Sequence, residues 1–312
     1  MAKTGLEERL EQLKRLRGAS PDSGAISLVR KSLQDRANLI VAEAAKVVAE
    51  HHLSSLIPDL LRAFERLLDN PVKTDPKCWG KLAIVQALTR LDYSESPPFL
   101  RGAHHVQMEP VWGGQEDAAA QLRAGCVLAL VQCNDLTRTE IFRELIDALA
   151  DPEDPVRLEA VRSIAQMNGD DAALLLRLKA RAGDRRPVVS GHVFDALLSL
   201  EERRGVRFVA EYLESSDAEV RYEAAFSLAG SRLAEAIQVL IETWNQSKDR
   251  EFRDLILRAL SAARQPAAID FLLGVVRTGL THDASTAAAA LQLNDSPEIH
   301  ALVEQAQKDR LK

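Results

Sequence analysis

Histidine and cysteine are the residues of this chain that could bind a metal ion or act as nucleophiles. The histidines include two adjacent pairs, His51-His52 and His104-His105. Neighbouring side chains on a helix point about 100° apart, so neither pair predicts ligands for one ion. The sequence has no CxxC or HExxH motif, whose spacings would bring ligands together. We expect no metal site. A site formed by Cys78 together with His104 and His105 remains the alternative.

Motifs for other kinds of catalysis are also absent from the sequence. It contains no GxSxG, GxGxxG or P-loop motif. Gly113-Gly114 predicts a turn and not a phosphate-binding loop, because we expect no strand before it and no Lys-Ser or Lys-Thr follows. The three scattered cysteines, an odd number, indicate reduced thiols and no disulfide framework. We therefore expect neither cofactor nor enzymatic activity.

Composition indicates what kind of elements position these residues. Hydrophobic residues make up 46% of the 312-residue chain and aromatic residues only 4%, which favours helices over strands. The formal net charge of −6 argues against a general nucleic-acid-binding protein. The N-terminal stretch MAKTGLEERLEQLKRLRG lacks the apolar segment of a signal peptide, and no apolar run is long enough to span a membrane. We expect a cytoplasmic protein.

An internal repeat of about 32 residues is the strongest pattern. Mostly apolar or small residues recur at that spacing in three sets. The first set is Val156, Val188, Val220, Phe252 and Ala284, and the second is Ala160, His192, Ala224, Ile256 and Ala288. The third set is Ile164, Ala196, Leu228, Leu260 and Gln292. Successive sets are four residues apart, which places them on one helix face. In the second of these units a register shifted by one, through Val189, Val193, Phe194 and Leu197, fits at least as well.

A second helix follows in each unit. Its register is given by Leu176, Phe208, Leu240 and Leu272, followed four residues later by Ala180, Tyr212, Trp244 and Val276. Each unit is thus predicted to be a helix pair, helix A and then helix B. Trp244 falls in the register of the buried face. At the helix starts, Asp217 precedes Arg221 by four residues and Asp249 precedes Arg253 likewise, which predicts an N-cap and an ion pair one turn later.

Weaker copies of the pattern extend toward the N-terminus. LRAGCVLALVQ matches VRLEAVRSIAQ at an offset of 34, and NLIVAEAAKVVAEHH with SSLIPDLLRAFERLLDN forms another pair. We divide the chain into an N-terminal amphipathic helix and linker (1–24), N-terminal helical repeats (25–106), a connector loop (107–117) and C-terminal repeats (118–312). The two repeat segments are expected to form one continuous array that buries its faces between neighbouring pairs.

The stretches DPVRLEAVRSIAQM, AEVRYEAAFSLAG and AIQVLIETW resemble HEAT repeats, in particular the short PBS-lyase-like variety. The resemblance covers roughly residues 25 to 312 and implies an all-α, right-handed α-solenoid of tandem antiparallel helix pairs. The ankyrin TPLH signature and the tetratricopeptide pattern are absent.

The resemblance raises three enzymatic activities that are known among HEAT-like folds. Deoxyhypusine hydroxylase holds iron through His-Glu motifs, and no histidine here is followed by Glu. DNA glycosylases for alkylated bases would need a basic groove, which the mixed charges do not predict. Bilin lyases share the repeat, and a lyase or chromophore-chaperone role stays an alternative because a fold name transfers no reaction.

The leading interpretation is a non-enzymatic scaffold or adaptor that binds a protein or peptide. Stacked B helices are expected to form a continuous concave face. The candidate contact residues there are Arg207, Glu211, Gln238, Glu242, Asn245, Asp270 and Arg277.

The connector carries two further candidate contact residues, Met108 and Trp112. We expect a helix that starts at Pro97-Pro98 to stop near Glu109, because Pro110 disfavours a helical residue before it. Asp117 is expected to cap the next helix. For Trp112 two interpretations remain: the indole folds back over a repeat junction, or it is exposed as an anchor for a partner.

Overall fold

The computed structural model describes residues 5–18 and 22–311. Over these ranges the chain consists of α-helices, a few short 3-10 helices and one two-stranded hairpin. The all-α prediction is therefore confirmed except for the hairpin. Contacts divide the chain into two compact units, Met1–Gln166 (unit 1) and Met167–Lys312 (unit 2). No helix in the described ranges is long and apolar enough to cross a bilayer.

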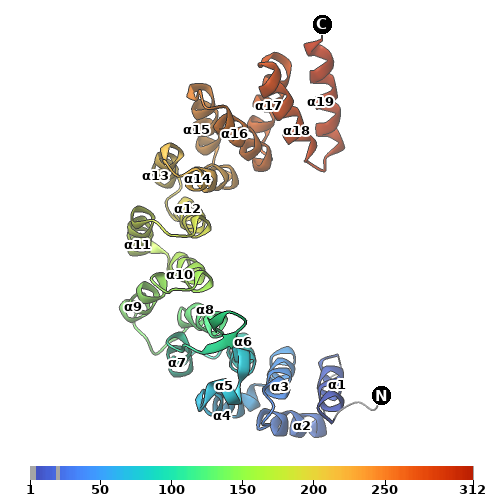
Figure 1. Cartoon of the computed structure of the whole chain (residues 1–312), viewed down its shortest axis with the longest axis vertical. Coiled ribbons are helices and arrows are strands. Elements are labelled where there is room, and N and C mark those ends of the chain that lie inside the picture. The colour runs from blue at the N-terminus through green and yellow to red at the C-terminus, as the bar shows by residue number, and fades with distance from the viewer. Residues whose placement is uncertain (1–4, 19–21, 312) are drawn as a thin grey trace. The chain divides into compact units, whose positions relative to one another are not determined.

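Unit 1 contains the elements labelled α1 to α10 in Figure 1. They are α1 (Gly5–Arg17), α2 (Ser23–Leu33), α3 (Asn38–Glu50), η1 (Ser54–Leu56), α4 (Ile57–Leu68), α5 (Pro71–Thr74), η2 (Pro76–Cys78), α6 (Trp79–Arg90), α7 (Pro97–Ala103), β1 (Met108–Val111), β2 (Gly114–Asp117), α8 (Ala120–Leu130), α9 (Arg138–Leu149) and α10 (Asp154–Met167), whose last residue belongs to unit 2.

Unit 2 continues the succession of helix pairs. Its elements are α11 (Gly169–Ala182), α12 (Pro187–Glu201), α13 (Arg203–Ala210), η3 (Glu211–Glu214), α14 (Ala218–Gly230), α15 (Ala234–Gln246), α16 (Arg250–Ala263), α17 (Pro266–Thr278), α18 (Thr281–Gln292) and α19 (Pro297–Arg310). The even-numbered helices α12, α14 and α16 are the predicted A helices, and the odd-numbered helices that follow them are the B helices.

The predicted repeat register matches the buried positions in α10, α14 and α16, whereas Gln292 of the third set is exposed. In the third set Ile164, Leu228 and Leu260 are completely buried. In α12, for which the sequence allows two registers, Val189 and Phe194 are completely buried whereas Val188 is 36% exposed. The shifted register is therefore the correct one for α12.

The helix starts confirm the predicted caps but not the predicted ion pairs. Asp217 accepts hydrogen bonds from the first backbone N–H groups of α14, and Asp249 does the same for α16. Arg221 instead donates to the carbonyl oxygen of Ser215, and Arg253 pairs with Asp283 on α18 at 2.6 Å. The arginine side chains are long enough to satisfy carbonyl groups of the preceding turn, which have no helical partner.

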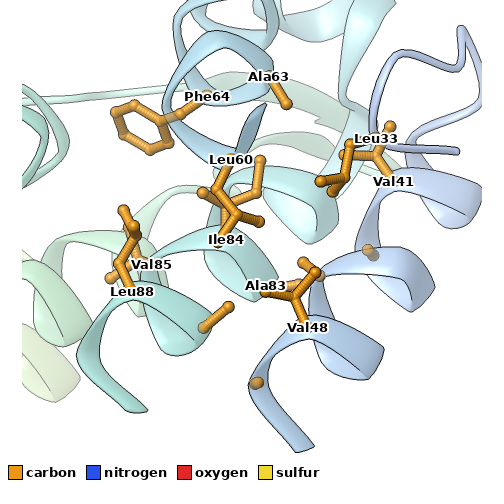
Figure 2. Packing of buried hydrophobic residues seen from close by; sticks show 14 of the residues in the cluster. Leu33, Val41, Val48, Leu60, Ala63, Phe64, Ala83, Ile84, Val85 and Leu88 are labelled. Atoms are coloured by element: carbon orange, nitrogen blue, oxygen red, sulfur yellow. The ribbon is translucent and has the colours of Figure 1, made fainter. Parts of the chain in front are cut away.

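The core of unit 1 is an apolar cluster shared by neighbouring helix pairs. Figure 2 shows Leu60 of α4 next to Ile84 of α6, with Phe64 of α4 on one side of this pair and Val48 of α3 on the other. All four side chains are completely buried. Each helix pair covers the apolar face of the next, as tandem repeats require.

Within unit 2 the two rows of helices pack differently. Successive A helices contact one another along much of their length, whereas α13, α15 and α17 touch at fewer points. Ser227 of α14 donates to the carbonyl oxygen of Gly191 on α12 at 3.2 Å, which requires close backbone approach. Ser261 of α16 makes the same kind of bond to Ala290 of α18 at 2.7 Å. Consistent with this, α12, α14, α16 and α18 follow the inner edge of the curve of unit 2 in Figure 1.

Candidate functional site

The predicted connector loop is a β-hairpin. Strands β1 and β2 pair antiparallel, with Val111 opposite Gly114, and Trp112 and Gly113 form the turn between them. Gly113 has φ of +92°, a conformation that residues with a Cβ rarely adopt. The predicted turn is confirmed, whereas the expectation that no strand precedes it is wrong.

The helix before the hairpin starts where expected and ends earlier than expected. It begins at Pro97 and ends at Ala103, not near Glu109. Pro110 lies inside β1, in an exposed two-stranded ribbon where a missing N–H group is tolerated. The helix therefore ends at Ala103, seven residues before Pro110.

Trp112 is fully exposed at the tip of the hairpin, with a relative exposure of 103%. The interpretation that its indole folds back over a repeat junction is wrong. Met108 and Val111 are each 45% exposed, and Val106 just before the strand is 59% exposed. These four exposed apolar residues are called the hairpin patch below, although Met108 and Val111, three positions apart in β1, point to opposite faces of the ribbon.

The base of the hairpin is fixed by Gln107, which is almost completely buried. Its side-chain amide donates to the carbonyl oxygen of Asp75 at 2.9 Å, and its amide oxygen accepts from Nζ of Lys81 at 3.0 Å. Glu109 of β1 accepts the backbone N–H of Lys77 at 2.6 Å. These bonds join the hairpin to the segment between α5 and α6.

Arg123 of α8 fixes the other side of the hairpin. Its guanidinium makes two bonds to Asp151, at 2.8 and 3.0 Å, and one to Asp117 at 2.5 Å. Burial disfavours the charge, yet the hydrogen bonds to both carboxylates outweigh it and raise the guanidinium pKa. Asp117 also accepts the backbone N–H of Gln107. Its expected role as the cap of α8 is wrong, because the N-cap residue is Ala119, whose N–H Asp117 accepts.

A buried ion pair lies beneath this network. Nζ of Lys81 is 3.1 Å from Oδ2 of Asp75, and neither side chain has any exposed surface. Asp75 also accepts from the Asn38 side chain and from the backbone N–H groups of Gly80 and Lys81. A buried charge needs such partners to be tolerated, so the arrangement holds the start of α6 rigidly against the hairpin.

Of the cysteines and histidines, Cys78 and His105 come together at the amide oxygen of Gln107. Burial raises the pKa of the Cys78 thiol to about 12 and that of Cys133 to about 11. The Cys78 thiol donates to the amide oxygen of Gln107, and His104 bonds Glu144 at 2.7 Å. No described group of three or more His, Cys, Asp or Glu side chains is arranged for a metal ion.

The candidate contact residues of the B helices all lie on exposed positions. They are Arg207 on α13, Glu211 on η3, Gln238, Glu242 and Asn245 on α15, and Asp270 and Arg277 on α17. Glu211 pairs with Arg181 at 2.7 Å, and Gln238 donates to Glu242 at 2.8 Å. Trp244, by contrast, is buried as predicted, with the Arg253 guanidinium 3.7 Å from its ring centre.

That these residues contact a partner stays a prediction, and the row of helices that carries them follows the outer edge of unit 2. Figure 1 shows α13, α15 and α17 along the outer edge of the curve, and the A helices along its inner edge. The physical reason is the small side chains of the A helices, such as Gly191 and Ser227, which let these helices approach more closely. The row with the shorter spacing lies on the inside of a curved stack.

The inner edge of unit 2 is hollowed at two places. A hollow of about 510 Å³ between α12 and α14 is lined by Asp195, Leu198, Ser199, Glu223, Phe226, Ser227, Gly230 and Ser231. A second, of about 340 Å³, is lined by Phe226, Arg258, Ser261, Ala262, Arg264, Ala290, Leu293 and Asn294. Phe226 borders both hollows, and the two hollows with Phe226 between them are called the A-helix groove below. None of its lining residues was among the candidates taken from the sequence.

Comparison with known proteins identifies the repeat. Residues 206–294 match the family model described as HEAT repeats. A search of curated proteins finds no match. Among solved structures, human deoxyhypusine hydroxylase in complex with glycerol is similar at 19% identity over 84% of this chain and 91% of that chain, with a TM-score of 0.31. A chain of the Pds5-Scc1 complex is similar at 13% identity over 100% of this chain and 69% of that chain, with a TM-score of 0.35.

Proposed function

Since residues 206–294 match the HEAT-repeat family model, we propose that the protein is a non-enzymatic scaffold that binds a protein partner. HEAT-repeat solenoids typically serve as protein-interaction scaffolds. We further propose that the hairpin patch is one of its contact surfaces. The observation that carries this proposal is Trp112, whose indole is fully exposed on a hairpin with a fixed base.

An exposed indole on a rigid support has two properties that favour binding. Its large apolar surface gains free energy when a partner removes it from water. Because Gln107 and Arg123 already fix the base of the hairpin, little conformational entropy is lost when the tip docks. Aromatic anchors of this kind carry a large share of the binding energy in protein interfaces.

The thiol environments support a role without covalent chemistry. All three cysteines are buried, and burial raises the pKa of each thiol. A buried thiol that stays protonated is a poor nucleophile. This favours the scaffold over a lyase that would use its own cysteine.

The test is site-specific photocrosslinking combined with an affinity measurement. A photoreactive phenylalanine analogue replaces Trp112 in one preparation and Leu174, which is 66% exposed on α11, in the matched control. Proteins crosslinked in native lysate only at position 112 are identified by mass spectrometry and purified. We expect Trp112→Ala to weaken the purified partner's affinity roughly thirtyfold, about 2 kcal/mol, and Leu174→Ala to leave it unchanged.

Two outcomes would contradict the proposal. One is the absence of any protein crosslinked at position 112 above the level of the control position. The other is a crosslinked protein that binds Trp112→Ala as tightly as the unmodified chain.

A further inference from the structure

The A-helix groove carries a charge arrangement that suits a specific kind of protein segment. On α12 the exposed side chains Val188, His192, Asp195 and Ser199 follow one helix face. The hollow beside them has two carboxylates, Asp195 and Glu223, among its lining residues and no basic side chain. The neighbouring hollow has Arg258 and Arg264 and no acidic side chain. The groove is thus anionic at one end and cationic at the other.

The two carboxylates at the anionic end have His192 as a basic neighbour and no arginine or lysine partner in the part of the chain that the structure describes. Neither Asp195 nor Glu223 forms an ion pair there, whereas the nearby Asp254 is paired with His282 at 2.9 Å. Burial raises the pKa of Glu223, and the negative charge of Asp195 raises it further. A cation placed between the two carboxylates would relieve this repulsion.

The backbone of α12 is shaped to hold Glu223 in the groove. The Glu223 carboxylate lies over Gly191, where a Cβ would collide with its Oε2 atom. Gly191 is buried in the middle of α12, a position where glycine lowers helix stability. Its presence lets the carboxylate approach the α12 backbone and stay beside Asp195.

An aromatic surface continues from the carboxylates. The rings of Tyr222 and Phe226 are stacked with centroids 4.4 Å apart and an interplanar angle of 30°. Tyr222 is 45% exposed, and Phe226 lies between the anionic and cationic hollows. The aliphatic stem and charged end of Arg or Lys pack favourably on such rings.

We propose that the A-helix groove binds an extended protein segment whose charges are complementary to those of the groove. A basic side chain of the segment lies between Asp195 and Glu223, against Phe226. An acidic group of the segment lies at Arg258 and Arg264. This inference rests on the proposed scaffold function and adds the chemistry of a partner. The separation of charge along the groove sets the direction of the bound segment, because reversing the charges would place like charges together.

The proposal is tested by peptide selection on the full-length protein. A library of random twelve-residue peptides is selected on the unmodified chain, on Asp195→Asn/Glu223→Gln, and on the matched control Glu298→Gln/Glu304→Gln, which removes two exposed carboxylates from α19. We expect the selected peptides to be enriched in Arg or Lys with an acidic residue farther along. The enrichment should disappear on the groove variant and persist on the control.

The best peptide is then measured by fluorescence anisotropy at low salt. We expect at least a tenfold loss of affinity for Asp195→Asn/Glu223→Gln, as for other charged contacts, and a comparable loss for Arg258→Gln/Arg264→Gln. The proposal is overturned if no peptides are enriched, if acidic or purely apolar peptides dominate, or if the groove variants bind unchanged.

The two proposals can fail separately. Trp112→Ala leaves the A-helix groove intact and should bind the selected peptide normally. If the groove fails while crosslinking at Trp112 succeeds, the scaffold function stands and the partner chemistry proposed here is wrong. If both fail, the scaffold function fails with them.

Discussion

Lys81 and Asp75 form an ion pair of 3.1 Å in which both side chains are completely buried. The pair lies at the start of α6, where Asp75 also accepts two backbone N–H groups of that helix. Lys81 in turn donates to Gln107 at the base of the hairpin. The buried pair therefore connects the repeat core to the support of Trp112.

Replacing Lys81 with Met should lower the free energy of unfolding of the cooperative unit by about 3–5 kcal/mol, because Asp75 would lose its buried countercharge. The measurement is urea unfolding followed by circular dichroism. The double variant Asp75→Asn/Lys81→Met should lose less than the sum of the two single variants. Lys14→Met, whose pair with Glu11 is exposed, should change stability by no more than about 1 kcal/mol. Equal effects of Lys81→Met and Lys14→Met would show that the buried pair has no special role.

Gly102 of α7 is expected to tolerate no side chain. A Cβ there would overlap the Cys126 sulfur and lie 3.4 Å from the Phe64 ring, and all three residues are buried. Gly102→Ala should therefore destabilise the protein by about 1–3 kcal/mol, as overpacked cores do. Gly125→Ala on α8 is the matched control, since its nearest atom would be 3.7 Å away. In thermal unfolding the control should be neutral or stabilised by up to about 1 kcal/mol, and a similar loss in both would refute the overlap.

The free energy of unfolding of unit 1 should fall at acid pH because Asp117 is protonated there. Burial alone would raise its pKa, but backbone N–H groups of Gln107 and Ala119, with the Arg123 guanidinium, lower the pKa below the usual value. A carboxyl group with a lowered folded-state pKa contributes stability above its unfolded pKa, near 4, and loses it as pH falls further. The difference in unfolding free energy between the unmodified chain and Asp117→Asn should be constant from pH 7 to 5 and shrink below about pH 4. A difference that stays constant down to pH 2.5 would contradict this account.

The periodic pattern of the sequence predicts the helices well because burial follows the same spacing in every repeat. It reproduces the buried faces of α10, α14 and α16, and it places Trp244 in the core. The caps Asp217 and Asp249 follow from local hydrogen bonding and are also correct. These features depend on residues close together in the chain.

The features that the pattern missed depend on residues far apart. Lys81 stands in an apolar stretch as an isolated charge, and its partner Gln107 comes 26 residues later. The hairpin strands have only four residues each, too few to give a clear alternation. Whether the A helices or the B helices lie on the inner edge of unit 2 depends on how closely successive helices of each row approach one another. The repeat period of the sequence does not give these distances. The small residues of the A helices, such as Gly191 and Ser227, are the sequence signal that these helices pack closely.

Binding at the A-helix groove should weaken at acid pH. Burial and the charges of Asp195 and Glu219 raise the pKa of Glu223, and His192 opposes them. A raised pKa means that Glu223 takes up a proton at higher pH than an ordinary glutamate, whose pKa is about 4.3. The neutral carboxyl no longer attracts a basic side chain, so the affinity for the selected peptide should fall as Glu223 is protonated.

The measurement uses a His192→Gln background, so that the carboxyl group is tested without the imidazole. Peptide affinity is measured by anisotropy between pH 7 and about pH 4, the ordinary glutamate value, with peptides whose own carboxylates are replaced by sulfonates to keep their charge constant. His192→Gln should lose affinity over this range, and His192→Gln/Glu223→Gln should bind more weakly at pH 7 with a flatter pH profile. If the two variants follow parallel pH profiles, Glu223 does not titrate against the bound cation, and the basic residue of the peptide is seated elsewhere.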